Sequence, residues 1–290
     1  MSTFKVHLRK ELNKLTIERF PSLYRPDSLP FISGDTFRKF SNHVFDETQT
    51  FNPKIVKKND IIFINSDLIK IFFKIQDPKI QNKYILISHN SDNSPSIEEL
   101  KLISNNVLHW FAQNLEFNFE ERITLLPIGL ENKRWLRNVN FKKQTMNISL
   151  KTNLILCSFS VHNNFKIRNA VLNLANNNAN IEIKKFDNNK QYFKDLKNYK
   201  FILCPPGSGP DTHRVWESLI YRTFPIFETN NFTKNLKKLG VPGIYLKSWN
   251  EINKFSEKDL DNEYKNLSSI NLDILYFKFW KEQFMKKFII

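Results

Sequence analysis

Two glycines, an arginine and a glutamate lie at short spacing in one segment, residues 201–227 (FILCPPGSGPDTHRVWESLIYRTFPIF). The pattern is typical of a strand, a glycine-containing loop, a helix, a turn and a second strand. Gly207 and Gly209 allow the backbone to approach a ligand closely, and a glycine loop that opens a helix offers free N–H groups to an anion. Arg214 adds a charged donor suited to phosphate oxygens, and Glu217 can accept hydroxyl groups of a ribose or hexose. The segment therefore predicts a site for a phosphorylated ligand.

The helix after this loop separates its polar residues from its hydrophobic ones. Asp211, Arg214 and Glu217 are three residues apart and share one arc of the helix. The other arc is hydrophobic and should face the sheet: Val215, Trp216, Leu219 and Ile220. Asp211 or Thr212 is expected to cap the helix. The alternative is that Arg214 and Glu217 form only a surface ion pair, and the spacing alone leaves both interpretations open.

A second group of hydroxyl and basic side chains follows another hydrophobic run. Ser158 and Ser160 end that run, and Lys166 and Arg168 belong to the helix predicted after it. Two hydroxyls and two cations at a strand-to-helix junction suit a pyrophosphate that leaves during group transfer, because fixed positive charge must stabilise it if no metal ion does. The alternative is a solvated basic start of a helix in a lysine-rich chain.

Residues 205–227 resemble the donor-binding segment of exostosin-like glycosyltransferases and their bacterial and viral relatives, in which a Pro/Gly turn precedes an R-x-x-E helix and a short strand with a proline. The pattern G-x-D-x-x-R-x-W-E-S-L stands here at Gly209, Asp211, Arg214, Trp216, Glu217, Ser218 and Leu219. Three upstream stretches, FISGDTFRKFSNHVFDE, YILISHNSD and LLPIGLENKRW, resemble the N-terminal half of the bacterial members. The chain departs from the family at residues 221–223, where related sequences often carry a glycine.

The resemblance implies a glycosyltransferase of the two-domain GT-B architecture. Its donor would be a nucleotide-diphosphate sugar, and its acceptor a hydroxyl of a glycan, polysaccharide or lipid-linked glycoconjugate. Neither a cofactor nor an obligatory metal ion is implied.

An inverting enzyme of this kind needs a carboxylate or a histidine in its acceptor-side domain to deprotonate the attacking hydroxyl. The candidates are Asp35, His43, His89, Asp92 and Glu131. Asp35 ranks first, because it follows one predicted strand and leads into a helix, although it can equally cap that helix. Asp92 ranks second. His89 can instead be a half-buried side chain with its hydrogen bonds satisfied, and Glu131 can pair with a neighbouring lysine or arginine.

A metal site is not expected. The chain contains no D-x-D triplet of the kind that holds a divalent cation in the other major transferase architecture, and HNSDNS (89–94) has a single carboxylate. The sequence therefore predicts metal-independent chemistry.

Short hydrophobic runs alternate with helical patterns along most of the chain. In the first half the predicted strands are 29–33, 60–66, 83–89 and 122–129, with helices at 35–47 and 67–76. In the second half the predicted strands are 154–160, 181–186, 201–205, 224–228 and 244–248, with helices at 165–177, 190–199 and 211–222. A polar stretch at 138–153 predicts the linker between them. Such alternation indicates parallel sheets built from βαβ units.

The predicted fold is therefore α/β, with two Rossmann-like domains facing a cleft as in GT-B enzymes. Residues 1–145 would form the acceptor-side domain and residues 150–270 the nucleotide-sugar-binding domain, and a helix within 271–290 would cross back to the first domain. Since ligands of open parallel sheets lie beyond the carboxyl ends of the strands, the donor site is expected on the loops that follow them.

The last segment, 272–290, reads as a helix that is both aromatic and basic. It places Leu275, Phe279 and Phe288 among lysines 278, 281, 286 and 287. Packing on the first domain is the expected role, because helices rich in Phe and Trp usually belong to a core. The alternative is that part of this surface rests on an anionic membrane.

The composition supports a globular protein with real cores: 41% of the residues are hydrophobic and 27 are Phe. The net charge of +15 should draw the chain toward phosphorylated ligands, other polyanions or anionic membranes. The two cysteines lie in hydrophobic runs and suggest a reducing compartment. Neither a signal peptide nor a stretch of about 20 apolar residues is visible, so a cytoplasmic protein is expected.

Two further functions stay open. A nucleotide-sugar epimerase, or an inactive nucleotide-sugar-binding relative, would have the same kind of donor site. A basic nucleic-acid-binding protein is the more distant alternative. It is disfavoured because the charge is spread along the whole chain and no nucleic-acid-binding module is recognised.

Overall fold

The structure, a computed structural model, describes residues 25–117, 121–133 and 150–288. Most of the predicted linker, and the termini beyond these ranges, lie outside the described residues. The described part is an α/β fold with two five-stranded parallel sheets, one in each half of the chain, which is compatible with two Rossmann-like domains. None of the described helices is long and apolar enough to cross a bilayer.

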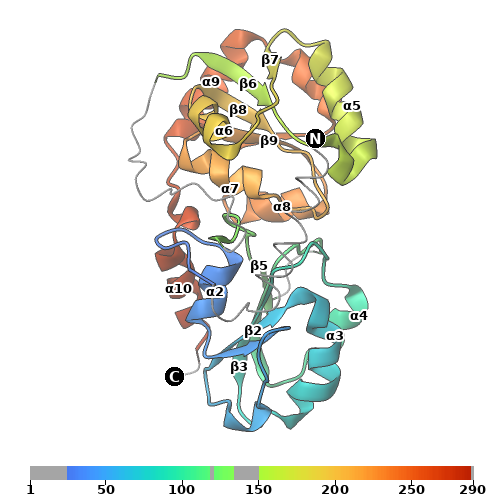
Figure 1. The fold of residues 1–290 in the computed structure, drawn as a ribbon, viewed down its shortest axis with the longest axis vertical. Coiled ribbons are helices and arrows are strands. Elements are labelled where there is room, and N and C mark those ends of the chain that lie inside the picture. The colour runs from blue at the N-terminus through green and yellow to red at the C-terminus, as the bar shows by residue number, and fades with distance from the viewer. Residues whose placement is uncertain (1–24, 118–120, 134–149, 289–290) are drawn as a thin grey trace.

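The first sheet has the sequential strand order β1-β2-β3-β4-β5. Its strands are β1 His43–Phe45, β2 Ile61–Asn65, β3 Tyr84–His89, β4 Val107–Ala112 and β5 Ile123–Leu125. The helices of this half are α2 Gly34–Phe40, α3 Ile69–Ile71, which continues into a π-helical turn at Phe72–Gln76, and α4 Ile97–Leu100. Figure 1 shows α3 and α4 on one side of this sheet and α2 with the C-terminal helix α10 (Phe277–Met285) on the other.

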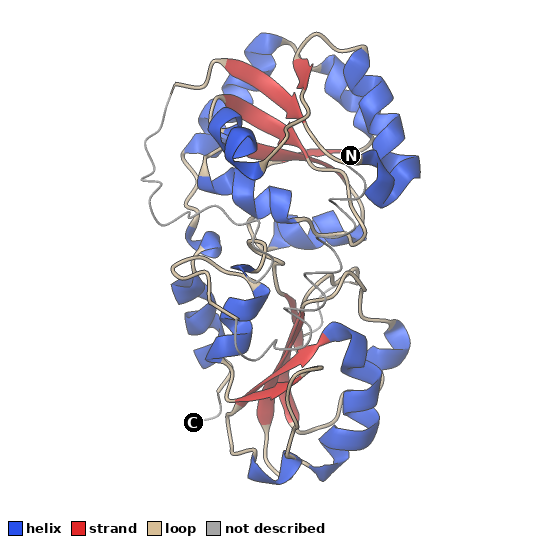
Figure 2. Cartoon of the chain, in the orientation of Figure 1, coloured by secondary structure: helices blue, strands red, loops and turns tan. Residues whose placement is uncertain are grey.

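The second sheet has the order β7-β6-β8-β9-β10. Its strands are β6 Asn153–Cys157, β7 Ile181–Ile183, β8 Tyr199–Leu203, β9 Phe224–Glu228 and β10 Ile244–Leu246. Its helices are α5 Phe165–Asn176, α6 Asn189–Leu196, α7 His213–Ile220, α8 Asn231–Lys238 and α9 Glu257–Ser268. Helix α5 lies on one side of the sheet and α6 with α7 on the other (Figure 2), as expected when the chain winds outward in both directions from β6 and β8.

Local sequence explains where several helices begin. The side chains of Ser33, Asn188 and Asn230 accept hydrogen bonds from the first turns of α2, α6 and α8. Helix α7 buries its whole hydrophobic arc, with Trp216 and Leu219 fully inaccessible, as the helical spacing predicted. Thr212 occupies its N-cap position, but its side chain makes no capping hydrogen bond.

In the first half, two predicted elements were wrong and one strand was missed. Residues 29–33 do not form a strand: they make only isolated bridges, from Phe31 to Tyr276 and from Ser33 to Gly129. The helix predicted at 35–47 ends at Phe40, because the next hydrophobic residues pair with β2 as strand β1. Strand β4 was not predicted, since a short, continuously hydrophobic run cannot be assigned to strand or helix by periodicity alone.

The loops at the carboxyl ends of the first sheet contact the second half of the chain. After β4, the carbonyl oxygen of Leu115 accepts a hydrogen bond from Asn235 Nδ2 on α8 (2.9 Å). After β5, the backbone N–H of Ile128 donates to Asp211 Oδ2 (2.8 Å). The carboxyl edge of the first sheet therefore lies against the segment that carries the predicted donor site.

Helix α10 packs against elements of the first half. The ring of Phe284 contacts those of Phe37 and Phe40 on α2, and it lies 4.7 Å from the ring of Phe111 on β4. The backbone N–H of Phe277 donates to Pro30 O (2.9 Å). The aromatic residues of the C-terminal segment thus belong to the core beside the first sheet.

Candidate functional site

The strand order of the second sheet indicates where a ligand would bind. In the order β7-β6-β8-β9-β10 the chain leaves β6 toward β7 and then returns to β8 on the other side. The loops that follow β6 and β8 therefore diverge from each other and leave a crevice beyond their carboxyl ends, which is the usual ligand site of doubly wound sheets.

The structure has a pocket of about 890 Å³ at this crevice. The second half of the chain supplies most of its wall, through residues after β6 (157–163), after β7 (183–189) and around the glycine loop (207–217), and the first half supplies Asp92, Ile128 and Glu131. All the predicted donor-binding residues except Lys166 line the pocket. The predicted residues therefore share one pocket wall beyond the carboxyl ends of the strands, and their role in donor binding stays a prediction.

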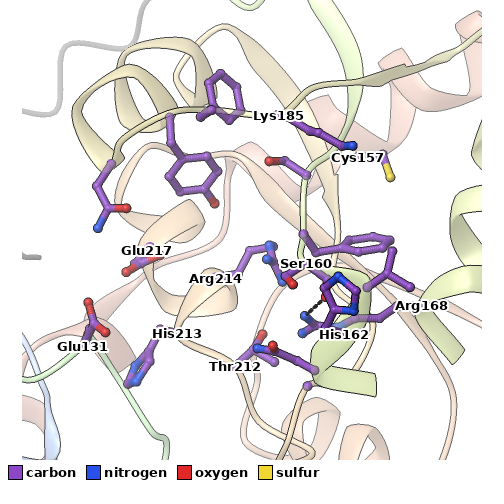
Figure 3. A pocket seen from close by; sticks show the side chains of 18 of the residues that line it. Glu131, Cys157, Ser160, His162, Arg168, Lys185, Thr212, His213, Arg214 and Glu217 are labelled. Atoms are coloured by element: carbon purple, nitrogen blue, oxygen red, sulfur yellow. Dashed lines mark hydrogen bonds between the residues drawn. The ribbon is translucent and has the colours of Figure 1, made fainter. Parts of the chain in front are cut away.

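Arg214 and Glu217 project from α7 into this pocket (Figure 3). No ion pair joins them in the described part of the chain, so the surface ion pair considered above does not form. The guanidinium of Arg214 lies 5.8 Å from the ring of Phe159. Two buried polar atoms of the pocket wall make no hydrogen bond to any described residue: Thr212 Oγ1 and Arg214 Nε. Because such atoms are normally satisfied, they suit a polar ligand or ordered water at this wall.

The Glu217 carboxyl has an altered acidity. Its burial, helped by the negative charge of Glu131 and opposed by Arg214, raises its pKa to about 8. At neutral pH this carboxyl is therefore largely protonated, and it can donate a hydrogen bond as well as accept one.

This shift predicts a change in how stability depends on pH. Between its ordinary pKa of 4.5 and the folded-state value of about 8, the folded protein binds more protons at Glu217 than the unfolded chain does. The free energy of unfolding should therefore fall as pH rises from 4.5 to 8, and Glu217→Gln should flatten that fall. Chemical denaturation at pH 5 and pH 8.5 measures it. Glu98→Gln, at an exposed position on α4, is the control. Parallel pH dependences of the wild type and Glu217→Gln would contradict the assignment.

Arg168 lies in the pocket wall but is bound mainly to backbone. It is 3% exposed, and it donates from Nη1 to Ser160 O (2.7 Å) and from Nε to Pro206 O (2.9 Å). Its Nη2 would be 2.9 Å from a Cβ at Gly207, which explains the glycine there. Burial and the neighbouring charge of Arg214 lower the pKa of Arg168 to about 10. Arg168 therefore ties the loop after β6 to the loop after β8, and contact with a pyrophosphate stays a prediction.

Asp211 also has protein partners for both of its carboxylate oxygens. Oδ2 accepts from Ile128 N, Oδ1 accepts from Thr212 N (2.8 Å), and Trp216 Nε1 donates to both. Burial raises the pKa of Asp211 to about 7, and these donors oppose the rise. Its contacts join α7 to the loop after β5, and direct donor binding by Asp211 stays a prediction.

The remaining predicted binding residues differ in position. Ser158 and Ser160 line the pocket at the end of β6, and Gly209 packs closely on the first half: a Cβ there would be 2.8 Å from Asp92 O. Lys166 is exposed on α5 and is not part of the pocket wall.

Of the candidates for the catalytic base, Asp35 lies outside the pocket wall. It is fully buried in the first turn of α2, with Oδ1 3.2 Å from Arg25 Nη1. His43 pairs with Asp60 (2.7 Å). His89 is buried against Pro127 O (3.0 Å), and burial lowers its pKa to about 4. These contacts are structural.

Asp92 and Glu131 are the candidates that line the pocket, both from the first half of the chain. Asp92 is exposed, and Glu131 is half-buried. Figure 3 shows Glu131, His213 and Glu217 gathered at one side of the pocket.

Sequence reasoning missed part of the wall. Lys184, Lys185, Phe186 and Tyr192 line the pocket after β7. The prediction extended that strand to residue 186, whereas β7 ends at Ile183. A shorter strand would have placed Lys184, Lys185 and Phe186 on a third loop at the same sheet edge, and Tyr192 follows on α6.

No group of three or more His, Cys, Asp or Glu residues in the described ranges is arranged to hold a metal ion. Cys157 and Cys204 are free and buried, and burial raises the pKa of each thiol to about 12. Both are therefore unreactive thiols at neutral pH.

Comparison with known protein families bears on the half that forms most of this pocket. Residues 157–290 match the family model of the RXYLT1 C-terminal domain. No curated protein matches the chain. The match begins at the last residue of β6 and includes every pocket residue from the second half. It supports a glycosyltransferase-type function for this part of the protein.

Proposed function

We propose that the protein is a glycosyltransferase that moves a sugar from a nucleotide-diphosphate sugar to a hydroxyl of a glycan or glycoconjugate acceptor. The observation that carries this proposal is the pocket at the switch point of the second sheet, whose wall includes the G-x-D-x-x-R-x-W-E segment. The match to the RXYLT1 C-terminal domain covers the same residues.

The charges of the pocket favour an anionic donor. Arg168 and Arg214 are like charges in one pocket wall and repel each other, and burial followed by this repulsion lowers the pKa of Arg168. Both also lie near the ring of Phe159, at 5.5 Å and 5.8 Å. A diphosphate placed beside Arg214 would relieve that repulsion, and it would accept charge-assisted hydrogen bonds. In this arrangement Glu217 binds hydroxyl groups of the donor.

The pocket also contains aromatic surface suited to a nucleobase. Phe186 and Tyr192 line it next to each other, with ring centroids 5.6 Å apart. Buried aromatic faces stack on bases without strict sequence preference. In this proposal the donor's nucleoside lies toward β7 and its diphosphate toward α7.

We further propose a GT-B-like arrangement, with an acceptor-side domain at 1–145, a donor domain at 150–270 and a final segment at 271–290 that returns to the first domain. The contacts of α10 with α2 and β4 support this division. The acceptor would then approach from the loops of the first sheet, where Asp92 and Glu131 line the pocket.

Thermal shift with UDP, GDP, CMP and dTDP tests the donor assignment, because a ligand that binds only the folded state raises the melting temperature. At least one nucleotide is expected to raise it in the presence of EDTA, since the proposed chemistry needs no metal ion. Release of nucleoside diphosphate from UDP-glucose, UDP-xylose, GDP-mannose and dTDP-glucose then measures transfer. Turnover abolished by EDTA and restored by Mn²⁺ would refute metal independence, and no shift with any nucleotide would refute the donor site.

The same experiment separates the alternatives. An inactive relative would bind a nucleotide and cleave no donor, and an epimerase would change the sugar without releasing nucleoside diphosphate. Binding of nucleic acid instead of nucleotides would favour the basic nucleic-acid-binding protein.

A further inference from the structure

Glu131 reaches the pocket from the loop that follows β5. Its place in the wall depends on contacts with both halves of the chain. The backbone N–H of Leu130 donates to Ile32 O (2.9 Å). Gly129 adopts a φ of +67°, and a Cβ at this position would lie 2.5 Å from Ile32 O. Glycine is therefore required two residues before Glu131 for the loop to take this path.

The second half of the chain holds the same loop from the other side. His213 Nδ1 donates to Gly129 O (2.8 Å), and Asp211 Oδ2 accepts from Ile128 N (2.8 Å). Both residues stand at the start of α7, which also carries Glu217. The acidic side chain from the first half is thus fixed relative to the helix that forms the donor wall.

Glu131 and Glu217 lie at the same side of the pocket (Figure 3). The negative charge of Glu131 is a cause of the raised pKa of Glu217. The other titratable groups on this side of the pocket are His213, whose pKa is lowered by burial, Asp211 and Asp92. Asp211 is occupied by its three N–H donors. Glu131 and Asp92 are the carboxylates of the first half that line this pocket.

We propose that Glu131 is the general base of the transfer reaction, and that Asp211 and His213 are positioning residues that hold its loop against α7. The inference rests on the glycosyltransferase function proposed above, and it replaces Asp35 and Asp92 as the predicted base. Asp35 is excluded because it is buried outside the pocket wall. Glu131 is preferred to Asp92 because its loop is fixed from both halves, whereas Asp92 is exposed.

The step is a direct displacement with inversion. The Glu131 carboxylate takes the proton of the acceptor hydroxyl, and the acceptor oxygen forms a bond to the anomeric carbon of the sugar. The bond from that carbon to the diphosphate oxygen breaks, and its electron pair stays on the nucleoside diphosphate. Arg214 stabilises the negative charge that develops there.

The test compares Glu131→Gln with Asp92→Asn in the full chain, with Glu98→Gln as the control at an exposed position of the same half. Nucleotide binding is measured by calorimetry with the best nucleotide of the panel, and donor cleavage with water as acceptor is measured with the four donors named above. Glu131→Gln should keep its melting temperature and bind the nucleotide within about twofold of wild type, while kcat falls about 100- to 10,000-fold. The fall in kcat that the wild type shows at acidic pH should be absent from the pH profile of Glu131→Gln.

Azide distinguishes a base from a structural residue. Azide attacks without losing a proton, so it should restore donor cleavage in Glu131→Ala and yield a glycosyl azide of inverted configuration, with little effect on the wild type. If Glu131 merely shaped the pocket, azide would not restore donor cleavage in Glu131→Ala.

The outcomes that overturn the inference are separate from those that overturn the function. Two results overturn the assignment of Glu131 while the transferase stands. The first is full turnover in Glu131→Gln. The second is a comparable loss of turnover in Asp92→Asn, with azide rescuing Asp92→Ala but not Glu131→Ala. A loss in Glu131→Gln that azide does not rescue also overturns it. A wild type that binds no nucleotide, or that binds one and cleaves no donor even with azide, overturns the proposed transferase and this inference together.

Discussion

Arg214→Ala should weaken the binding of a nucleoside diphosphate by about 1.5–3 kcal/mol, roughly 10- to 100-fold in Kd. The reason is that Arg214 projects into the pocket without an ion-pair partner in the described part of the chain, so its charge is available to phosphate oxygens. Arg214→Lys should recover only part of the loss, because a lysine keeps the charge but not the two-pronged geometry of the guanidinium. Isothermal calorimetry with the best nucleotide of the panel measures both.

The matched control is Lys194→Ala, which removes one positive charge from an exposed position on α6 outside the pocket wall. It should leave the Kd unchanged, so that a loss in Arg214→Ala reports a local contact and not the net charge of +15. The melting temperature of each variant shows that it is folded. An unchanged Kd in Arg214→Ala would remove this residue from the donor site.

Much of the pocket wall could be predicted because its residues are close in sequence. One strand, one loop and one helix place Gly207, Arg214 and Glu217 together, and local spacing alone specifies such an arrangement. The hydrogen bonds of Arg168 and Asp211 were harder to predict from the sequence. Both are charged residues beside the glycine loop, but their partners are backbone groups of Ser160, Pro206 and Ile128, which no side-chain pattern indicates.

The part of the pocket wall that the first half of the chain supplies was harder to predict for a different reason. Glu131 enters the pocket only because the loop after β5 is held by α7, which follows it by about 80 positions in the chain. Asp35 ranked higher because it follows a hydrophobic run, but that run is not a strand, and the residue is buried beside Arg25. The rule about strand ends was applied there to a strand that the structure does not contain.

The fold, like the pocket, could be predicted where local sequence decides it and not where distant segments decide it. Long alternating patterns predicted β2, β3, α5 and α7 within a few residues. The pattern could not predict strand order, and the order is what distinguishes the two sheets: sequential in the first and doubly wound in the second. Order depends on which faces the crossover segments cover, and that is decided by packing between distant segments such as α2 and α10.

Phe284→Ala should destabilise the protein by about 3–5 kcal/mol, the usual cost of emptying a buried phenylalanine site. Its side chain is 0% exposed and lies among the rings of Phe37, Phe40 and Phe111. The neighbouring Met285 is 52% exposed on the same helix, so Met285→Ala is the matched control and should change the free energy of unfolding by less than about 0.5 kcal/mol. Urea denaturation followed by circular dichroism measures both.

The pair of variants also tests the membrane interpretation of the C-terminal segment. If α10 belongs to the core, the groups left for an anionic membrane are its exposed lysines, at positions 278, 281, 286 and 287, and Met285. Attachment would then be electrostatic, at about 1 kcal/mol for each lysine near the surface, and changing Lys281, Lys286 and Lys287 to Glu would abolish it without unfolding the protein. Co-sedimentation with vesicles containing phosphatidylserine, at low and high salt, measures that binding. If Phe284→Ala left the protein fully stable but released it from such vesicles, the aromatic face would be a membrane contact and the packing of α10 on the first sheet would be wrong.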